Sequence, residues 1–248
     1  MFALNDSVIV GIPARRGSTR LANKMLADLC GAPVVVRTWQ SVREAGFEHV
    51  CVATDDEEIA AVVREAGGVA VLTGEHPNGT ARIAEALAAR RKKFVLNVQG
   101  DEPLVSAETL HRIVRGLEEC PGTTTGICTG AAPLDPADAE RPERVKVVTT
   151  LEGRALYFSR RAIPYGGPYR VHVGVYGFYR TALQRVAGLP PSPFDEGERL
   201  EQLRWMAHGY RIHVVDVEAP APSVDTQEDL DRVRAIFASQ RPSSSGIG

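Results

Sequence analysis

A cluster of cationic side chains follows the first apolar run of the sequence. That run, residues 8–12, is typical of a buried strand and is interrupted at Pro13. Small residues in the loop behind it let backbone amides approach a ligand, and Arg and Lys add positive charge. Open α/β sheets build phosphate sites from such a strand, loop and helix. We therefore predict an anion site here in preference to a solvated basic loop; its cations are Arg15, Arg16, Arg20 and Lys24.

An acidic side chain could complete this site. Asp101 follows the apolar run at residues 94–98, so its carboxylate should lie at the same edge of the sheet as the cationic loop. Phosphate loops of this kind generally work with Mg²⁺, and carboxylates are its protein ligands. Asp101 is therefore a candidate metal ligand. The alternative is that Asp101 or Glu102 caps the helix expected at residues 106–119.

A third polar stretch opens another predicted helix. Asn78 or Thr80 can cap a helix that runs to about Arg91. The first turn offers free amides, the small Gly79, a hydroxyl and the cation of Arg82, so polar ligand groups could bind there. An ordinary capped helix explains the stretch equally well.

The order of elements predicts the sheet that positions these residues. Strands at 8–12, 49–54 and 69–72 alternate with helices at 34–45 and 57–66, which indicates a parallel sheet with right-handed crossovers. From about residue 123 the pattern becomes antiparallel. There we expect strands at 123–129 and 171–179, a surface segment at 131–144 and a hairpin of 145–150 with 154–158. A helix at 199–208, a strand at 210–217 and a last helix follow; Thr226 and Asp229 resemble the capping box of that helix.

The expected fold is therefore α/β: a Rossmann-like, mostly parallel mixed sheet with helices on both faces and a small antiparallel lobe. We assign residues 1–238 to one domain, with the lobe at about 123–180, and 239–248 to a disordered tail. A net charge of −2 over 248 residues speaks against nucleic-acid binding, and no apolar stretch approaches the roughly 20 residues of a membrane span. Neither CxxC spacing nor a signal segment is present, so we expect a cytoplasmic protein with reduced thiols.

Several stretches, taken together, resemble one enzyme family. They occur in order along nearly the whole chain, from about Val8 to Ala238. The family is that of 3-deoxy-manno-octulosonate cytidylyltransferase, or CMP-Kdo synthetase. The stretches are IPARxxSTRLxxK at 12–24, NGTxR at 78–82, NVQGDEP at 97–103, LYFSR at 156–160, HVGVYG at 172–177, LEQLR at 200–204 and VDT at 224–226.

The resemblance implies a cytidylyltransferase that activates Kdo with CTP and Mg²⁺, releases pyrophosphate and forms a homodimer through the antiparallel lobe. It also implies roles for individual residues. Arg15 and Lys24 match catalytic phosphate-binding residues, and Asp101 and Asp225 match the metal-binding aspartates, although Asp225 could simply belong to the last helix cap. The matching nucleotide positions are Pro13, Ala14, Arg15, Lys24, Asn78, Gly79, Thr80, Arg82 and Gln99. The matching sugar-pocket positions are His172, Tyr176, Glu201 and Gln202.

Two further assignments concern the acceptor. Arg160 is our candidate cation for the sugar carboxylate. His172 is the one nearby side chain that could titrate near neutrality, and we prefer sugar binding to base catalysis for it. A metal-bound hydroxyl needs no dedicated protein base.

The sequence departs from the family pattern at two places. Ala22-Asn23 stands where Pro-Gly usually precedes the loop lysine, but Asn tolerates a positive φ. The segment 165–171, beside the expected sugar pocket, is short. CMP transfer to a different acid, such as an amino-Kdo or another 2-keto or hydroxy acid, is therefore an alternative. A non-catalytic nucleotide-binding relative is a weaker one, because Lys24, Asp101 and Asp225 are all present.

Overall fold

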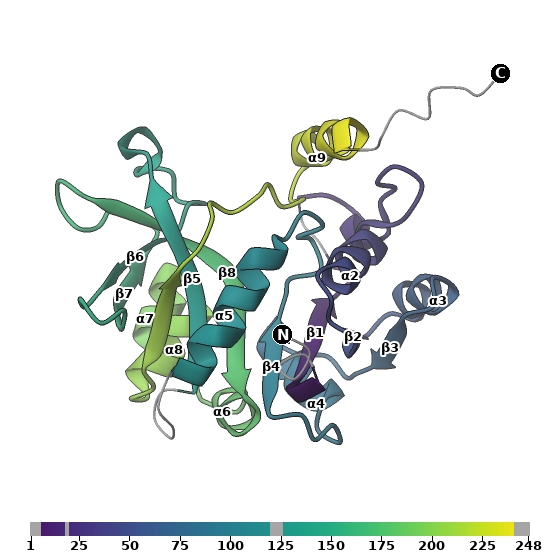
Figure 1. The fold of residues 1–248 in the computed structure, drawn as a ribbon, viewed down its shortest axis with the longest axis horizontal. Coiled ribbons are helices and arrows are strands. Elements are labelled where there is room, and N and C mark those ends of the chain that lie inside the picture. Colours follow the sequence, from purple (N-terminus) through teal and green to yellow (C-terminus); the bar gives the residue numbers. More distant parts are fainter. Residues whose placement is uncertain (1–5, 18–19, 120–125, 241–248) are drawn as a thin grey trace.

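The structure, a computed structural model, describes residues 6–17, 20–119 and 126–240. These residues form a mixed sheet of nine strands with the path β3-β2-β1-β4-β8-β5-β9 (Figure 1). β1 to β4 are mutually parallel, β8 runs antiparallel to β4 and β5, and β9 is parallel to β5. The strands are β1 (Val8–Ala14), β2 (Val50–Thr54), β3 (Val69–Leu72), β4 (Phe94–Asn97), β5 (Ile127–Leu134), β6 (Lys146–Thr149), β7 (Ala155–Ser159), β8 (Tyr169–Tyr179) and β9 (Ile212–Asp216).

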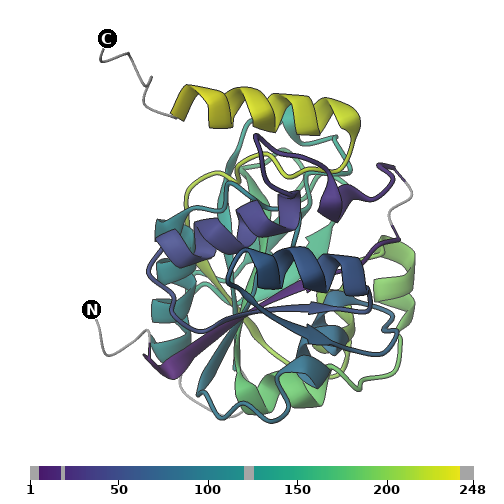
Figure 2. The same ribbon diagram turned by 90° about the vertical axis from the view of Figure 1, so that its right-hand side faces the viewer.

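Helices cover both faces of this sheet. α2, α3 and α5 pack on one face, where they meet Val8, Val10 and Ile12 of β1. α4, α6 and α8 pack on the other. α9 lies across one end of the molecule, where Leu230 and Val233 cover Leu29 (Figure 2). The helices are η1 (Lys24–Leu26), α2 (Val34–Glu44), α3 (Glu57–Glu65), α4 (Gly79–Ala86), α5 (Ala107–Glu119), η2 (Pro136–Asp138), α6 (Arg180–Val186), α7 (Pro193–Glu198), α8 (Glu201–Ala207) and α9 (Gln227–Gln240).

One close approach fixes α5 against the sheet. A Cβ at Gly177 of β8 would lie 2.8 Å from Ile113 Cγ2 and 2.8 Å from Leu117 Cδ1. The missing side chain therefore lets two buried residues of α5 settle on the strand. β8 pairs directly with β4, so the antiparallel half continues the parallel sheet.

Most predicted elements are confirmed. The hairpin exists as β6 paired with β7, and the strand at 69–72 is found at the same residues. Asp229 accepts from the Thr226 amide at 3.0 Å while Thr226 Oγ1 accepts from the Asp229 amide at 3.2 Å, which is the predicted capping box. α9 runs to Gln240, so the first two residues of the predicted tail are helical, and 241–248 lie outside the described residues.

Three predictions are wrong. The surface segment at 131–144 begins too early, because β5 continues to Leu134 with Ala131 and Ala132 buried against β8. The helix that was expected to reach Arg91 ends at Ala86, where a shorter-range bond from the Ala88 amide to the Glu85 carbonyl tightens the chain. The helix at 199–208 starts only at Glu201.

The late start of α8 has a backbone cause. Arg199 adopts a left-handed φ of 54°, which ends the preceding helix α7. The sequence analysis did not predict α6 or α7, which are short helices of seven and six residues. Ser192 and Asp195 nevertheless form a capping box that starts α7. Cys120 and the start of the strand predicted at 123–129 lie outside the described residues. No described helix is both long and apolar enough to cross a bilayer.

Candidate nucleotide and acceptor site

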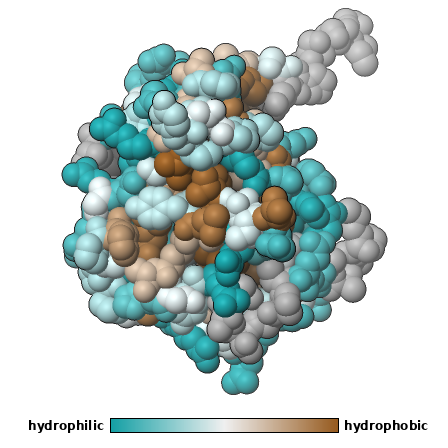
Figure 3. Space-filling model, turned by 90° about the vertical axis from the view of Figure 1, so that its left-hand side faces the viewer, coloured by the Kyte–Doolittle hydropathy of each residue, from teal (hydrophilic) through white to brown (hydrophobic). Residues whose placement is uncertain are grey.

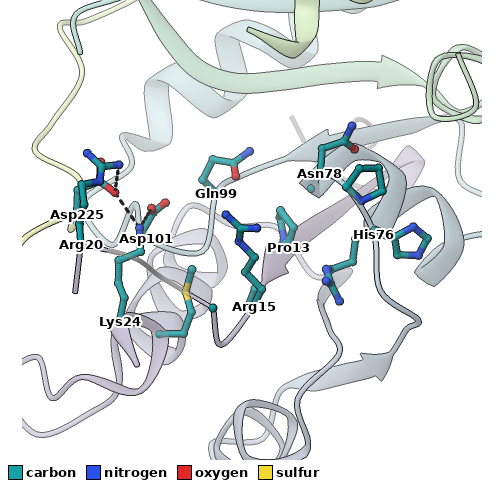
Figure 4. A pocket seen from close by; sticks show the side chains of 15 residues that line it. Pro13, Arg15, Arg20, Lys24, His76, Asn78, Gln99, Asp101 and Asp225 are labelled. Carbon is teal, nitrogen blue, oxygen red and sulfur yellow. Dashed lines mark hydrogen bonds and ion pairs between the residues drawn. The ribbon is translucent and has the colours of Figure 1, made fainter. Parts of the chain in front are cut away.

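A pocket of about 400 Å³ opens at the carboxyl ends of β1 and β4 (Figure 4). It combines the first loop, the start of α4, the exit of β4 and the segment before α9, so both halves of the chain contribute. Twelve of its fifteen lining residues are Pro13, Ala14, Arg15, Arg20, Lys24, His76, Asn78, Gly79, Arg82, Gln99, Asp101 and Asp225; Gly17, Met25 and Pro77 complete it. Eight of the nine residues predicted to bind the nucleotide therefore line this pocket, as do Asp101 and Asp225. The ninth, Thr80, is buried.

Two neighbouring arginines of the first loop, Arg15 and Arg16, differ in their contacts. Arg16 pairs with Asp56 at 3.1 Å and Glu58 at 2.9 Å, which holds the loop to the start of α3. Arg15 is exposed and has no ion pair or hydrogen bond within the described residues. Asn23 adopts φ 51°, so the turn before the lysine forms without glycine. Of these two neighbouring arginines, Arg15 is the one available to an anionic ligand.

Lys24 bridges the two predicted metal ligands. Its Nζ lies 2.5 Å from Asp101 Oδ2 and 2.9 Å from Asp225 Oδ1 (Figure 4). Burial disfavours the charged ammonium, but the two carboxylates outweigh it and raise the pKa of Lys24. Arg20 adds a third contact, 3.0 Å from Asp225 Oδ1. Two loops that are more than 100 residues apart in sequence thus meet around one ammonium group.

The start of α4 forms the opposite wall. Asn78 caps the helix by accepting from the Ala81 amide at 2.8 Å, as predicted. A Cβ at Gly79 would lie 2.8 Å from Pro13 Cγ, so only glycine allows α4 to approach β1 this closely. Arg82 is 3% exposed and pairs with Asp55 at 2.6 Å. The charge of Arg82 is therefore already balanced, whereas no described residue pairs with Arg15.

A chain of hydrogen bonds leads inward from this pocket. Gln99 donates to Asn97 Oδ1 at 3.3 Å, Asn97 donates to Thr80 Oγ1 at 3.3 Å, and Thr80 donates to Glu201 Oε2 at 3.0 Å. Sequence reasoning did not assign Asn97, although an amide inside the apolar run 94–98 was a signal. This chain connects the nucleotide side with α8, where two predicted sugar-pocket residues lie.

Three polar atoms near the inner end of this chain lack a hydrogen-bond partner in the described part of the protein. They are Tyr176 Oη, Gln202 Nε2 and Trp205 Nε1, all buried. The Tyr176 ring stands 5.0 Å from the Trp205 ring in an edge-to-face arrangement. Buried polar groups are normally paired, so these three atoms are available to bond to water or to a ligand. Tyr176 and Gln202 are among the residues that the resemblance assigns to the sugar.

His172 differs from its predicted behaviour. Its Nε2 lies 3.0 Å from Thr129 Oγ1, and its ring contacts Phe158 and Tyr176. Burial lowers the pKa of His172 to about 3, so it stays neutral at physiological pH. The expectation that it could titrate near neutrality is wrong. Instead, burial raises the pKa of Glu201 to about 7 and, with Asp101 and Asp225 nearby, that of Glu102 to about 8.

Arg160 lies outside the lining of the pocket. Its guanidinium donates to the carbonyls of Glu198 at 2.8 Å, Pro142 at 3.1 Å and Arg199 at 3.2 Å. Beside it, the buried Lys146 donates to the Arg160 carbonyl at 2.6 Å. These contacts join the hairpin to the end of α7. The assignment of Arg160 to the acceptor carboxylate stays a prediction.

The pKa of Glu201 predicts a pH-dependent stability difference. Between about pH 4.3 and 7 the folded protein holds a proton that the unfolded chain releases, so wild-type stability falls relative to Glu201→Gln as pH rises through this window. Gln can still accept from Thr80. We expect Glu201→Gln to gain about 1–3 kcal/mol over wild type between pH 5 and pH 8.

Urea unfolding at both pH values measures this gain. Glu65→Gln, at an exposed position on α3, is the matched control and should show almost none. An equal stability difference at pH 5 and pH 8 for Glu201→Gln would contradict the raised pKa.

The chain is similar to known cytidylyltransferases. A family model described as cytidylyltransferase matches residues 9–212. The 3-deoxy-manno-octulosonate cytidylyltransferase of Anaeromyxobacter sp. (strain Fw109-5) is 46% identical over 242 residues, which cover 93% of this chain and 97% of that protein. The enzyme of the same name from Methylococcus capsulatus is 44% identical, with 96% and 99% covered. A solved structure of CMP:2-keto-3-deoxy-manno-octonic acid synthetase complexed with CTP superposes with a TM-score of 0.89 at 36% identity and covers 94% of this chain and 99% of that one.

Proposed function

The chain belongs to the 3-deoxy-manno-octulosonate cytidylyltransferase family, and from this premise we propose that it joins CMP from CTP to Kdo and releases pyrophosphate. The observation that carries the proposal is the meeting of Arg15, which has no ion pair with a described residue, and the Lys24–Asp101–Asp225 cluster in one pocket. The solved relative that binds CTP has the same fold over nearly its whole length. Family membership and pocket chemistry therefore support the same reaction.

The nucleotide half needs positive charge on the phosphates. The anomeric hydroxyl of the sugar attacks the α-phosphorus, and negative charge grows on the phosphoryl oxygens and on the leaving pyrophosphate. Arg15 and Lys24, which both line the pocket, would neutralise this charge, and positioned cations stabilise such a transition state. The amides at the start of α4, next to Gly79, add donors on the opposite wall.

The donor set at the cluster fits Mg²⁺. Asp101 and Asp225 already direct carboxylate oxygens at one cation, the Lys24 ammonium, and hard oxygen ligands are those that Mg²⁺ prefers. The described residues contain no group of three or more His, Cys, Asp or Glu side chains suited to a metal, so phosphate oxygens and water would supply the remaining ligands. When bound, Mg²⁺ would neutralise phosphate charge and lower the pKa of a coordinated hydroxyl.

The sugar would bind at the buried polar side chains of Tyr176, Glu201 and Gln202. Tyr176 Oη and Gln202 Nε2 have no hydrogen-bond partner among residues 6–17, 20–119 and 126–240, so they can bond to sugar hydroxyls. Glu201 retains acceptor capacity beyond its bond from Thr80. Neutral His172 suits hydrogen bonding rather than base catalysis. The chain through Asn97 and Thr80 would keep these side chains in register with Gln99 at the nucleotide.

Pyrophosphate release across a panel of acids tests the proposal. We expect release only with CTP, Mg²⁺ and Kdo together. Release with an amino-Kdo or another 2-keto or hydroxy acid in preference to Kdo would assign a different acceptor. CTP binding without release under any acceptor would make the chain a non-catalytic relative.

We also propose a homodimer through the antiparallel lobe. Leu156 on β7 is 52% exposed, and Leu151 at the hairpin turn is fully exposed. Figure 3 views the side of the molecule that carries this hairpin and shows apolar residues gathered within a hydrophilic surround. Exposed apolar patches of this kind commonly mark protein interfaces. β7 pairs only with β6 among the described strands, so it also offers a sheet edge.

Replacing Leu156 by Asp should weaken this dimer. A carboxylate in an apolar interface loses its water without gaining a partner, so we expect the dissociation constant to rise by at least about 30-fold. Sedimentation velocity over a dilution series measures it. Val69→Asp, at a similarly exposed apolar residue on the distant strand β3, is the control and should leave the dimer intact. A wild-type protein that sediments as a monomer would contradict the proposal.

A further inference from the structure

The charged side chains in the cluster around Lys24 balance one another. Two positive side chains, Lys24 and Arg20, meet two negative ones, Asp101 and Asp225. The Lys24 side chain is 11% exposed and the two carboxylates are 20% and 31% exposed. At this partial burial, screening by water is incomplete and the charges interact strongly.

The carboxylates do not depend on Lys24 for their proximity. The Val224 amide donates to the Asp101 carbonyl at 2.9 Å, so the backbone ties the segment of Asp225 to the exit of β4. The cap of α9 at Thr226 and Asp229 holds the same segment from the other side. Lys24 instead lies on a short turn with its ammonium inserted between the two carboxylates (Figure 4).

A divalent cation cannot share this position with the ammonium. The same carboxylate oxygens, Asp101 Oδ2 and Asp225 Oδ1, already contact Nζ at hydrogen-bond distance. An added Mg²⁺ at these oxygens would stand a few ångströms from a positive charge and be repelled by it. Metal binding at these two oxygens therefore requires Lys24 to leave, and the leaving ammonium needs a new anionic partner.

We infer that Lys24 is the counter-ion of the Asp101–Asp225 pair before metal and nucleotide bind, and that Mg²⁺ displaces it toward the triphosphate. This inference rests on the proposed function, because it takes CTP as the new partner of the ammonium. It assigns Lys24 two positions, one on the carboxylates and one on the phosphates. Mg²⁺ alone binds weakly because the ammonium then lacks a partner, while CTP and Mg²⁺ promote each other's binding by the same factor.

Metal titration without acceptor tests this exchange. The full chain is titrated with MgCl₂ while its thermal unfolding midpoint is followed, first without nucleotide. In Lys24→Met the carboxylates keep only Arg20 as a counter-ion. We therefore expect a lower midpoint without metal and half-maximal stabilisation at an at least about tenfold lower Mg²⁺ concentration than in wild type. Lys24→Arg should behave like wild type, because it restores the charge. Arg15→Met, which removes a cation with no described ion pair from the same pocket, should leave the response to Mg²⁺ alone unchanged.

A second measurement follows the coupling itself. CTP should lower the Mg²⁺ concentration needed for half-maximal stabilisation in wild type by at least about tenfold, and by clearly less in Lys24→Met. Adding Asp101→Asn to Lys24→Met should abolish the gain in Mg²⁺ affinity, which would place the metal at these carboxylates. Equal Mg²⁺ requirements for wild type and Lys24→Met would overturn the inference. If Lys24→Met does not fold, Lys24→Gln replaces it with the same expectations.

The assay of pyrophosphate release with different acids distinguishes a failure of this inference from a failure of the proposed function. Pyrophosphate release by wild type with an unchanged Mg²⁺ response in Lys24→Met would retain the function and reject the exchange. A lower Mg²⁺ requirement in Lys24→Met, without pyrophosphate release by wild type in the presence of Kdo, would retain the exchange and reject Kdo as the acceptor.

Discussion

Replacing Asp101 by Asn is expected to lower kcat by at least about 10³-fold, equivalent to about 4 kcal/mol of transition-state stabilisation. Asn keeps the shape of the side chain and an acceptor for Lys24 Nζ, but it removes one of the two carboxylates that face the proposed metal position. The loss should appear in turnover rather than in folding, because Lys24 keeps its bond to Asp225. Steady-state pyrophosphate release at saturating CTP and Kdo measures the effect.

The matched control makes the same chemical change away from the pocket. Asp135 caps the short helix η2 by accepting from the Ala137 amide, a position where Asn serves as well as Asp. Asp135→Asn should retain wild-type turnover. If Asp101→Asn keeps near-normal turnover, Asp101 is not a required metal ligand.

Replacing Arg15 by Met is the second change with a large expected effect. We expect kcat/KM for CTP to fall by about 10²-fold, because removing one preorganised donor to developing phosphate charge has this size in related cases. Arg15 is exposed and has no ion pair with any described residue, so its loss should leave the unfolding midpoint within about 1 °C of wild type.

Arg16 provides an internal comparison one residue away. Its guanidinium pairs with Asp56 and Glu58 and does not line the pocket, so Arg16→Met should lower kcat/KM for CTP clearly less than Arg15→Met does. The two variants carry the same charge change in the same loop. Equal kinetic losses would show that overall positive charge near the pocket, rather than the placement of Arg15, assists the reaction.

The sequence predicted the parts of the site that depend on local patterns. Asn78 caps α4 and Asn23 makes the turn before Lys24, because each depends on neighbouring backbone groups. The parallel half of the sheet was predicted from the alternation of strand and helix patterns. This half of the sheet places Asp101 beside the first loop. The family resemblance added the residues of the acceptor half and Asp225.

What the sequence could not predict depends on distant pairs and on burial. The ion pair of Lys24 with Asp225 joins residues 201 positions apart, and the bond from Thr80 to Glu201 joins residues 121 apart. The neutral state of His172 and the raised pKa of Glu201 follow from how much water each site excludes, which no local pattern encodes. The prediction ended β5 too early for a similar reason. The small residues Gly130 to Ala132 are recognisable as a strand only from their pairing with β8.

Phosphorus NMR of the complete reaction tests the central claim most directly. Wild-type protein with CTP, Mg²⁺ and Kdo should convert the triphosphate signals into one pyrophosphate and one phosphodiester per CTP consumed, the latter being CMP joined to the sugar. Asp101→Asn should leave the triphosphate intact over the same time. Formation of pyrophosphate with free CMP and no phosphodiester, or no consumption of CTP, would contradict cytidylyl transfer to Kdo.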